Sequence, residues 1–528
     1  MEPELGRPFW RQLESDLREG RMGQPDPGED PPQRLVQRLA EQRVLAAGPG
    51  TSPACEMTGP PAHSCRMDGA ARRRPPGPSY WTPFGVGRTM RRDPLAFVTA
   101  LAREYGDVVC LGMGGPIRAY LFHHPDGVKH ILQDNNQNYV KGPIIGRVKV
   151  LFGEGLFTSE GDFWRRQRRL AQPAFHRERI AGFATTMVRR TAERLARWEP
   201  AIERGEPIDV GAEMNALTLT IAGETLFGRD LSGEASDAGR ALAVALAVLA
   251  HRAMSYVAPP IWVPTARNRA FRRAAATLDA LVYDIIDARQ RAHATGDDLL
   301  GMLMAARDED TGEGMSRRQL RDEVMTFLLA GHETTAVALA WTWYLLARHP
   351  HIAEQARGEV IGCLGDRPPT VADLPRLPLA RMVVEEAMRL YPPVWGVGRQ
   401  TIAADRIGGY DIPAGAIVNL SPWVTHRHPD FWPDPERFDP ERFRPGVERT
   451  RPRFAYFPFS GGPRLCIGEG FALMEMQLVV AMVLQRYRLT LVDERPVAPE
   501  TTLTLRPCGG LRMRAERVGP AARDRLAG

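Results

Sequence analysis

Residues 457–477 read FPFSGGPRLCIGEGFALMEMQ, and they place one cysteine, Cys466, between a turn rich in glycine and an apolar helical segment. A cysteine just ahead of a helix has its thiolate stabilised by the helix dipole and by free amide donors. The glycines Gly461, Gly462 and Gly468 let the backbone approach a flat ligand and point N–H groups at the sulfur. Taken alone, the pattern is more typical of a buried structural cysteine in a turn.

The same stretch fits the pattern F-x-x-G-x-R-x-C-x-G through Phe459, Gly462, Arg464, Cys466 and Gly468. This pattern closely resembles the haem-binding loop of the cytochrome P450 family. The resemblance is specific because five positions are fixed within ten residues. It implies that Cys466 is the axial thiolate ligand of the iron of haem b, and that Arg464 and Phe459 belong to the haem site.

A second resemblance involves charged residues at two separate places. Glu386 and Arg389 form an E-x-x-R motif on one helix face, which alone is typical of a surface salt bridge. The tetrapeptide PERF occurs at 435–438 and 440–443, but only the second copy fits F-x-P-x-R-F. In the family such residues form a buried structural network, which here implies Glu386, Arg389 and Arg442.

A long helix is predicted from Ser316, where Gln319 completes a capping-box pattern, to about residue 347. Such a helix is roughly 45 Å long and apolar on several faces, so we expect it to be buried. Its middle, AGHETT at 330–335, is unfavourable there because glycine weakens a helix and a buried carboxylate needs a partner. These residues predict a widened groove that holds water or a ligand; a kink stabilised by the threonines themselves is the alternative.

AGHETT also matches the family motif [AG]-G-x-[DE]-T-[TS]. The resemblance implies that Glu333 and Thr334 are catalytic. They would hold ordered water and deliver protons during the activation of O2. The threonine hydroxyl is barely acidic, so Thr334 is expected to position the water.

The segment WRRQRR places Trp164 and Arg168 four residues apart, on the same side of a helix. This resembles the family's W-x-x-x-R, which contacts haem propionates. Arg399 and Lys141 fall where the family often has further propionate partners, in addition to Arg464. The other arginines of this helix are expected to form a solvated face, and Arg165, Arg166 and Arg169 are predicted to attract an acidic redox partner.

Composition narrows the protein class only broadly. The 69 basic and 63 acidic residues give a net charge of +6 over 528 residues, which does not indicate a nucleic-acid partner. No membrane anchor or signal pattern is predicted, since the sequence has no long uninterrupted apolar run. The six cysteines are scattered without a CxxC pair, which favours a reducing, cytoplasmic location.

The resemblance covers most of the chain and implies one mainly α-helical domain with small β-sheets, a triangular prism around haem b. We expect this haem domain at residues 76–515. A Pro/Gly/Arg-rich extension at 1–75 is predicted to be disordered, because it is poor in branched apolar residues. Residues 516–528 are predicted to be a C-terminal tail.

The expected function is a haem-thiolate monooxygenase that inserts one atom of O2 into a lipophilic substrate, by C–H hydroxylation or epoxidation. Fatty-acid-like and terpenoid substrates are favoured, with polyketides and steroids open. Electrons must come from a separate ferredoxin or flavodoxin with its NAD(P)H-dependent reductase, because the residues after Cys466 are too few for a reductase domain. A peroxide-driven peroxygenase and a non-enzymatic haem-binding or sensing protein are the alternatives.

Overall fold

The computed structural model describes residues 73–78, 90, 92–112, 118–231, 233, 235–253, 259–292, 298–308 and 312–518. The chain divides into two units, Met1–Ala71 and Arg72–Gly528, and the described residues belong to the second. The predicted extension therefore lies outside the described residues, apart from residues 73–75.

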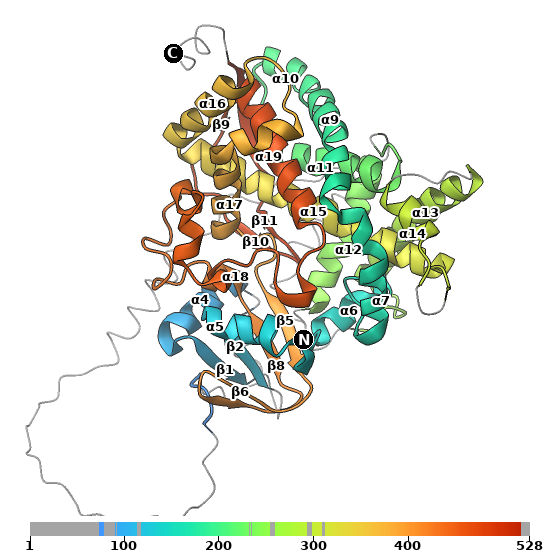
Figure 1. Cartoon of the computed structure of the whole chain (residues 1–528), viewed down its shortest axis with the longest axis vertical. Helices are drawn as coiled ribbons and strands as arrows, with labels where there is room; N and C mark the ends of the chain where they lie inside the picture. Colours follow the sequence, from blue (N-terminus) through green and yellow to red (C-terminus); the bar gives the residue numbers. More distant parts are fainter. Residues whose placement is uncertain are drawn as a thin grey trace, which may run out of the picture. The chain divides into compact units, whose positions relative to one another are not determined.

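Helices make up most of the second unit (Figure 1). The α-helices are α4 (Pro94–Tyr105), α5 (Pro125–Lys129), α6 (Pro143–Phe152), α7 (Gly161–Ala171), α8 (Arg177–Gly182), α9 (Ala184–Ala196), α10 (Glu199–Glu203), α11 (Val210–Phe227), α12 (Ala235–Ala253), α13 (Ala266–Arg291), α14 (Leu299–Ala305), α15 (Arg317–Arg348), α16 (Pro350–Leu364), α17 (Pro378–Leu390), α18 (Pro422–Thr425) and α19 (Glu469–Arg486). Short helical turns are η2 (His130–Asp134), η3 (Asn136–Asn138), η4 (Gln172–Phe175), η5 (Val371–Arg376), η6 (Pro440–Phe443), η7 (Val447–Thr450), η8 (Arg453–Ala455) and η9 (Gly462–Arg464).

In the described part of the chain, the strands are short and form four small sheets. They are β1 (Val108–Gly112), β2 (Arg118–Phe122), β3 (Tyr139–Val140), β4 (Ile208–Asp209), β5 (Val397–Thr401), β6 (Asp405–Ile407), β7 (Tyr410–Ile412), β8 (Ile417–Leu420), β9 (Tyr487–Leu491), β10 (Pro499–Thr501), β11 (Leu505–Pro507) and β12 (Arg512–Arg517). In Figure 1, β1, β2, β5 and β8 lie at the bottom, and α16 and α19 lie in the upper part.

Helix α15 is the central helix of the fold. It begins with the predicted capping box: the Ser316 hydroxyl accepts from the Gln319 backbone amide, and the Gln319 side chain accepts from the Ser316 amide. Among the described residues it alone is long and apolar enough to cross a membrane, yet 78% of its most apolar window is buried inside the protein. It packs against α11, α13, α17 and α19. These contacts are those of a core helix, as the sequence predicts.

The largest sheet has five strands in the order β1-β2-β8-β5-β3. β1 and β2 are antiparallel, with Val109 opposite Leu121. β2 then pairs parallel to β8, and β8 pairs antiparallel to β5. In this order β5 lies between β8 and β3, and its residue Arg399 is buried.

The ends of the described chain are fixed to the sheets by backbone hydrogen bonds. The Cys110 amide donates to the Pro76 carbonyl at 2.8 Å, and the Asp411 amide donates to the Arg73 carbonyl at 2.9 Å. At the other end, β12 continues to Arg517, past residue 515 where the domain was predicted to end.

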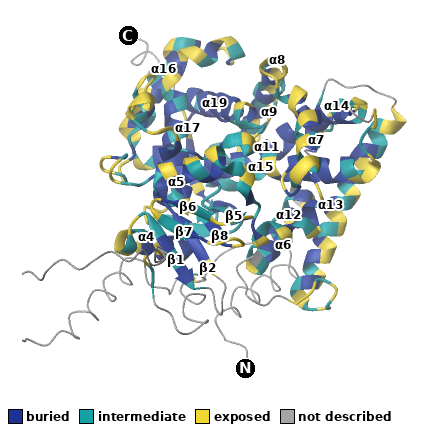
Figure 2. Cartoon of the chain, turned by 60° about the horizontal axis from the view of Figure 1, so that its bottom comes forward, coloured by how far each residue is buried: buried dark blue, intermediate teal, exposed yellow. Residues whose placement is uncertain are grey.

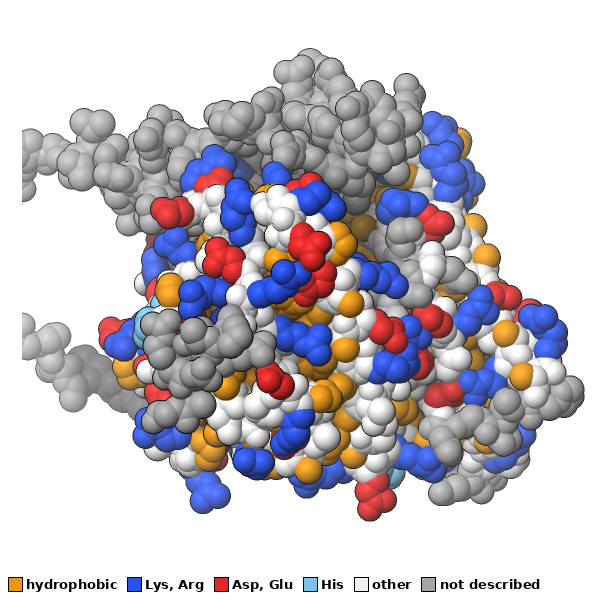
Figure 3. Space-filling view, turned by 90° about the horizontal axis from the view of Figure 1, so that it is seen from above, with side chains coloured by type: hydrophobic (Ala, Val, Ile, Leu, Met, Phe, Trp, Pro, Cys, Tyr) orange, Lys and Arg blue, Asp and Glu red, His pale blue; other side chains and the backbone are white. Residues whose placement is uncertain are grey.

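Burial follows the helical core, and charge covers the outside. Figure 2 shows buried residues concentrated along α19 and α17, with exposed residues on the outer helices. On the face seen in Figure 3, basic and acidic side chains are interspersed, as expected for a chain of small net charge.

Candidate functional site

Cys466 lies between η9 and α19, and its backbone is held in a tight loop. Its amide donates to the Phe459 carbonyl at 3.0 Å, and the Gly468 amide donates to its sulfur. Burial raises the pKa of the Cys466 thiol, while the Gly468 amide and Arg168 act to lower it. The side chain is nevertheless exposed. Because the Cys466 side chain is surrounded by protein and is still accessible, it borders an internal space.

Two glycines are required for this loop to close. Gly462 has a φ of +63°, and a Cβ there would lie 1.8 Å from the Leu132 carbonyl oxygen of η2. A Cβ on Gly461 would lie 2.3 Å from a ring carbon of Phe454. Only glycine fits such positions without moving the neighbouring backbone or ring. The glycines therefore bring the loop close to η2 and η8.

The middle of α15 is the second accessible place inside the fold. Most residues of this helix from Leu320 to Leu346 are buried, but Ala330 is exposed, and Glu333 and Thr334 are half-buried. These three positions share one helix face, because they are spaced three and four residues apart. Their exposure within a buried helix indicates that this face also borders an internal space.

The Thr334 hydroxyl donates to the Ala330 carbonyl at 2.7 Å, and the Thr335 hydroxyl donates to the Gly331 carbonyl at 3.2 Å. These are the bonds expected of the alternative in which the threonines stabilise a kink, and α15 is continuous from Arg317 to Arg348.

Glu333 has a partner that its own helix does not supply. The Thr504 hydroxyl, next to β11, donates to Glu333 Oε1 at 2.7 Å. Burial raises the pKa of Glu333, whereas the Thr504 hydrogen bond and the charge of Arg506 act to lower it. The sequence motif identifies Glu333 but gives no signal for Thr504, which is 171 residues away in the chain.

Cations from four separate segments lie close enough to affect one another. Burial lowers the pKa of Lys141 to about 7, with further contributions from Arg464 and Arg399. Burial also lowers the pKa of Arg399 to about 10, and that of Arg464 to about 10 with repulsion from Arg399, Arg165 and Arg168. Arg168 donates to the Leu465 carbonyl at 2.9 Å, next to Cys466.

One carboxylate, Glu160, lies among these cations. It accepts from the Lys141 backbone amide at 2.6 Å and forms an ion pair with Arg464. The Arg464 guanidinium also stacks on the Trp164 ring, 3.7 Å from its centroid. Glu160 was missed in the sequence, although an acidic residue just ahead of a helix is a recognised cap signal.

This cluster fits the acidic edge of a haem. Buried charges require opposite charges nearby. Among the described residues, Glu160 is the carboxylate that acts on Arg399, Arg464 and Lys141, while Arg168 faces the Cys466 sulfur. The hydrogen bond shown for the Arg399 guanidinium goes to the adjacent Gly398 carbonyl, which is neutral. The two propionates of a haem would supply the missing negative charge, so the residues present are suited to that group.

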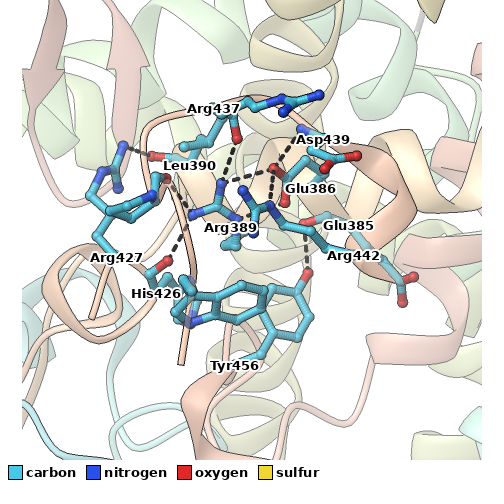
Figure 4. Close-up of polar contacts among 12 residues, drawn as sticks. Glu385, Glu386, Arg389, Leu390, His426, Arg427, Arg437, Asp439, Arg442 and Tyr456 are labelled. Carbon is cyan, nitrogen blue, oxygen red and sulfur yellow. Dashed lines mark hydrogen bonds and ion pairs between the residues drawn. The ribbon is translucent and has the colours of Figure 1, made fainter. Parts of the chain in front are cut away.

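A buried ion pair joins α17 to the segment after α18 (Figure 4). The Arg389 guanidinium donates to both carboxylate oxygens of Glu386, at 2.6 and 2.8 Å. It also donates to the carbonyls of His426, Pro435 and Arg437 at 2.9, 2.7 and 3.0 Å. Every N–H donor of the buried guanidinium therefore has an acceptor.

The two PERF copies differ in this network. Arg442 Nε lies 3.6 Å from Glu386 Oε1, and the Asp439 amide donates to the same oxygen at 2.9 Å. Arg437 contributes its carbonyl, and its side chain is exposed. The structure therefore brings Arg442, rather than the Arg437 side chain, to Glu386.

The arginines of α7 are not the uniform solvated face expected from the sequence. Arg166 and Arg169 both bond to the buried carboxylate of Asp308, at 2.9 and 3.0 Å. Arg165 is exposed and pairs with Asp162 within the same helix. The expectation was wrong for Arg166 because the loop after α14 covers that side of α7 with a carboxylate.

The fold and this set of residues are those expected of a family of haem enzymes, and comparisons with known proteins agree. The family model described as Cytochrome P450 matches residues 75–511. The chain is 38% identical over 432 residues to cyclooctatin synthase of Streptomyces melanosporofaciens, covering 81% of this chain and 92% of the relative. It is 34% identical to pentalenene oxygenase of Streptomyces avermitilis, covering 78% and 91%. The crystal structure of the cytochrome P450DA heme domain superposes with a TM-score of 0.79 at 30% identity, over 86% of this chain and 100% of that one.

The chain belongs to the cytochrome P450 family. The predicted mainly helical fold with small sheets is confirmed, and so is the predicted class of enzyme, a P450 monooxygenase. Members of this family carry haem with a cysteine thiolate as iron ligand.

Proposed function

We propose that this enzyme oxidises a terpenoid with O2 and that Cys466 is the thiolate ligand of its haem. The observation that carries the proposal is the accessible Cys466 sulfur, held by the Gly468 amide at the start of α19. Haem with a thiolate ligand supplies the activation of O2 and favours O–O cleavage. The protein binds the haem, orients the substrate beside it and supplies the protons.

The cation cluster is proposed to hold the propionates. Arg399, Arg464 and Lys141 would each regain favourable charge pairing, because their pKa values are lowered by burial and by mutual repulsion. Arg168 and Trp164 would complete the cradle from α7, and Phe459 would flank it from the cysteine loop. Glu160 would keep Arg464 oriented through its ion pair.

Glu333 and Thr334 are proposed as the proton-delivering pair. Both face the internal space beside Ala330. The pKa of Glu333 is raised by burial, so its carboxyl holds a proton to higher pH than an exposed glutamate. The Thr334 hydroxyl is anchored by the Ala330 carbonyl and would position water.

The substrate is proposed to be a terpenoid because relatives in two Streptomyces species carry names of terpenoid-modifying enzymes, among them cyclooctat-9-en-7-ol 5-monooxygenase at 38% identity. The small side chain of Ala330 and the half-buried Val394, Trp395 and Val397 before and within β5 suit an apolar molecule.

A small acidic electron carrier, ferredoxin or flavodoxin, is proposed as the redox partner. An open groove of about 440 Å³ is lined by Trp164, Arg165, Arg168, Arg169, Gln172, Pro173 and His176. Arg168 connects this basic groove to the cysteine loop through the Leu465 carbonyl. Arg165 is the best arginine to test, because Arg166 and Arg169 are engaged by Asp308.

The first experiment compares the reduced, carbon-monoxide difference spectrum of the wild type with that of Cys466→Ser. We expect a far-red-shifted Soret band that is lost in the variant; its persistence would exclude Cys466 as the ligand. Turnover is then measured with cyclooctat-9-en-7-ol, pentalenene and a long-chain fatty acid. Oxidation with ferredoxin and NAD(P)H supports the proposal. Turnover only with hydrogen peroxide would make the protein a peroxygenase. The absence of any turnover would instead indicate a haem-binding or sensing protein.

A further inference from the structure

We propose that the hairpin of β10 and β11 orients Glu333, with Thr504 as its positioning residue. The proposal rests on the proposed proton-delivering role of Glu333. It assigns control of that carboxyl to a segment 171 residues away in the chain, outside the α15 motif.

Thr504 is fixed in place by its neighbours. It is 6% exposed, and its hydroxyl lies 2.7 Å from Glu333 Oε1. The next residue, Leu505, accepts from the Trp341 indole N–H at 2.6 Å, and its amide donates to the Pro393 carbonyl at 3.0 Å. Trp341 lies on the same helix as Glu333. The hairpin and α15 are therefore joined at two places, so Thr504 meets Glu333 in a defined position.

The turn of the hairpin leaves the Thr504 hydroxyl hydrogen for Glu333. The Thr502 hydroxyl donates to the Thr504 carbonyl at 2.8 Å, and the Thr504 amide donates back to the Thr502 hydroxyl at 3.2 Å. Thr502 thus uses its hydroxyl to close the turn. A hydroxyl has one hydrogen to donate, and that of Thr504 goes to the carboxyl.

Arg506 supplies the charge beside this carboxyl. Its Nε donates to Glu500 Oε2 at 2.8 Å, and both side chains are about one-third exposed. The positive charge of Arg506 favours the ionised form of Glu333, while burial favours the neutral form. These opposed effects suit a group that must release and regain a proton in every turnover.

The hydrogen bond from Thr504 thus fixes one oxygen of the Glu333 carboxyl. A hydrogen bond to Oε1 removes the freedom of the side chain to rotate away from the internal space. We expect proton exchange at the other oxygen, Oε2. Without the anchor, the carboxyl would be misplaced during part of the turnovers, and electrons would be lost to hydrogen peroxide.

The test is Thr504→Val, which removes the hydroxyl and keeps the shape of the side chain. The reconstituted enzyme with ferredoxin, reductase and NAD(P)H is saturated with the panel compound of highest turnover. We expect product per NAD(P)H to fall about threefold to tenfold, the factor of one hydrogen bond, with a matching rise in peroxide. The pH at which coupling declines should move upward, because the ionised form of Glu333 loses a donor. Thr504→Ser should restore both values.

Thr501→Val is the matched control, since it makes the same change on β10 of the same hairpin, at a side chain that bonds to neither Thr504 nor Glu333. Its coupling and pH profile should equal those of the wild type. Equal loss in both valine variants would overturn the proposal, as would unchanged coupling in Thr504→Val. The carbon-monoxide spectrum and the substrate dissociation constant are measured for each variant, so that loss of haem or of substrate affinity is recognised separately.

Glu333→Gln separates this inference from the proposed function. If Glu333→Gln uncouples the enzyme and Thr504→Val does not, the hairpin proposal fails and the role of Glu333 stands. If Glu333→Gln leaves coupling unchanged, the role of Glu333 itself fails. In the double variant we expect no loss beyond that of Glu333→Gln, because both changes act through one contact.

Discussion

At the scale of single residues, the site contains buried cations whose charged form is less stable than it would be in water. The pKa of Arg399 is lowered to about 10 and that of Lys141 to about 7, so each cation is less favourable here than in water. Such strain is expected where a protein is prepared for a charged ligand rather than for its own stability. An anion bound among these residues would offset the repulsion.

Replacing Arg399 with glutamine should therefore have opposite effects on the two forms of the protein. We expect haem to dissociate about 10- to 100-fold faster, because one charge-assisted hydrogen bond is lost. Without haem, the variant should be at least as stable as the wild type, because a buried like charge is removed. Haem transfer to excess apomyoglobin measures the first effect and thermal denaturation the second. Arg165→Gln, an exposed arginine of α7, should change neither.

Residue motifs predicted both members of the Glu386–Arg389 pair, but for Arg464 and Glu333 they predicted only one side of a contact. Cys466, Arg464, Glu333 and Glu386 each stand in a short, fixed pattern. Glu160 and Thr504 do not, although they bond to Arg464 and Glu333 across 304 and 171 residues of the chain. Such contacts depend on how distant loops pack onto the helices, and no local periodicity encodes that.

At the scale of elements, α15 connects the site to the loop ahead of α7. The Leu156 amide donates to Glu323 Oε2 at 3.0 Å, and the Glu154 amide donates to Asp322 Oδ2 at 2.9 Å. A Cβ on Gly153 would lie 2.1 Å from Asp322, so the loop is pressed against the helix. The capping box, the length and the burial of α15 were predicted from sequence; these loop contacts were not.

Glu323 should make the stability of this contact depend on pH. Burial raises its pKa to about 8, with a smaller contribution from Asp322. Between the ordinary glutamate pKa and about 8 the folded state keeps a proton that the unfolded state has released, so stability falls as pH rises through this window and is constant above it. Glu323→Gln keeps the hydrogen bond and cannot ionise.

We expect the variant to match the wild type near pH 4 and to exceed it in stability by on the order of 4 kcal/mol at pH 8. Denaturant unfolding of both proteins at several pH values measures the difference. A gap that is constant with pH would contradict the assignment.

At the scale of the whole molecule, the Glu386–Arg389 pair ties α17 to the segment that runs from His426 to Arg442. The pair is fully buried, and Arg389 reaches three carbonyls of that segment. The same segment leads into the cysteine loop. The pair thus links the helical core to the approach of the site, and the sequence predicted its members but not the carbonyls that they bind.

Arg389→Lys should destabilise the fold, because an ammonium group cannot replace the planar guanidinium at these acceptors. An ammonium has three N–H donors for the five contacts of Arg389, so at least two buried acceptors lose their donor, and the expected cost is about 2–6 kcal/mol. It is measured by denaturant unfolding together with haem content after purification. Arg437→Lys is the control: its backbone carbonyl takes part, but its side chain is exposed, so stability should be unchanged.

Ala330 offers only a methyl group at the one exposed position of α15 between Leu320 and Leu346. Enlarging it to valine would change the shape available to a guest molecule while the helix keeps its packing on every other side. A single substitution at this position is therefore a simple starting point for changing which carbon of the substrate is oxidised.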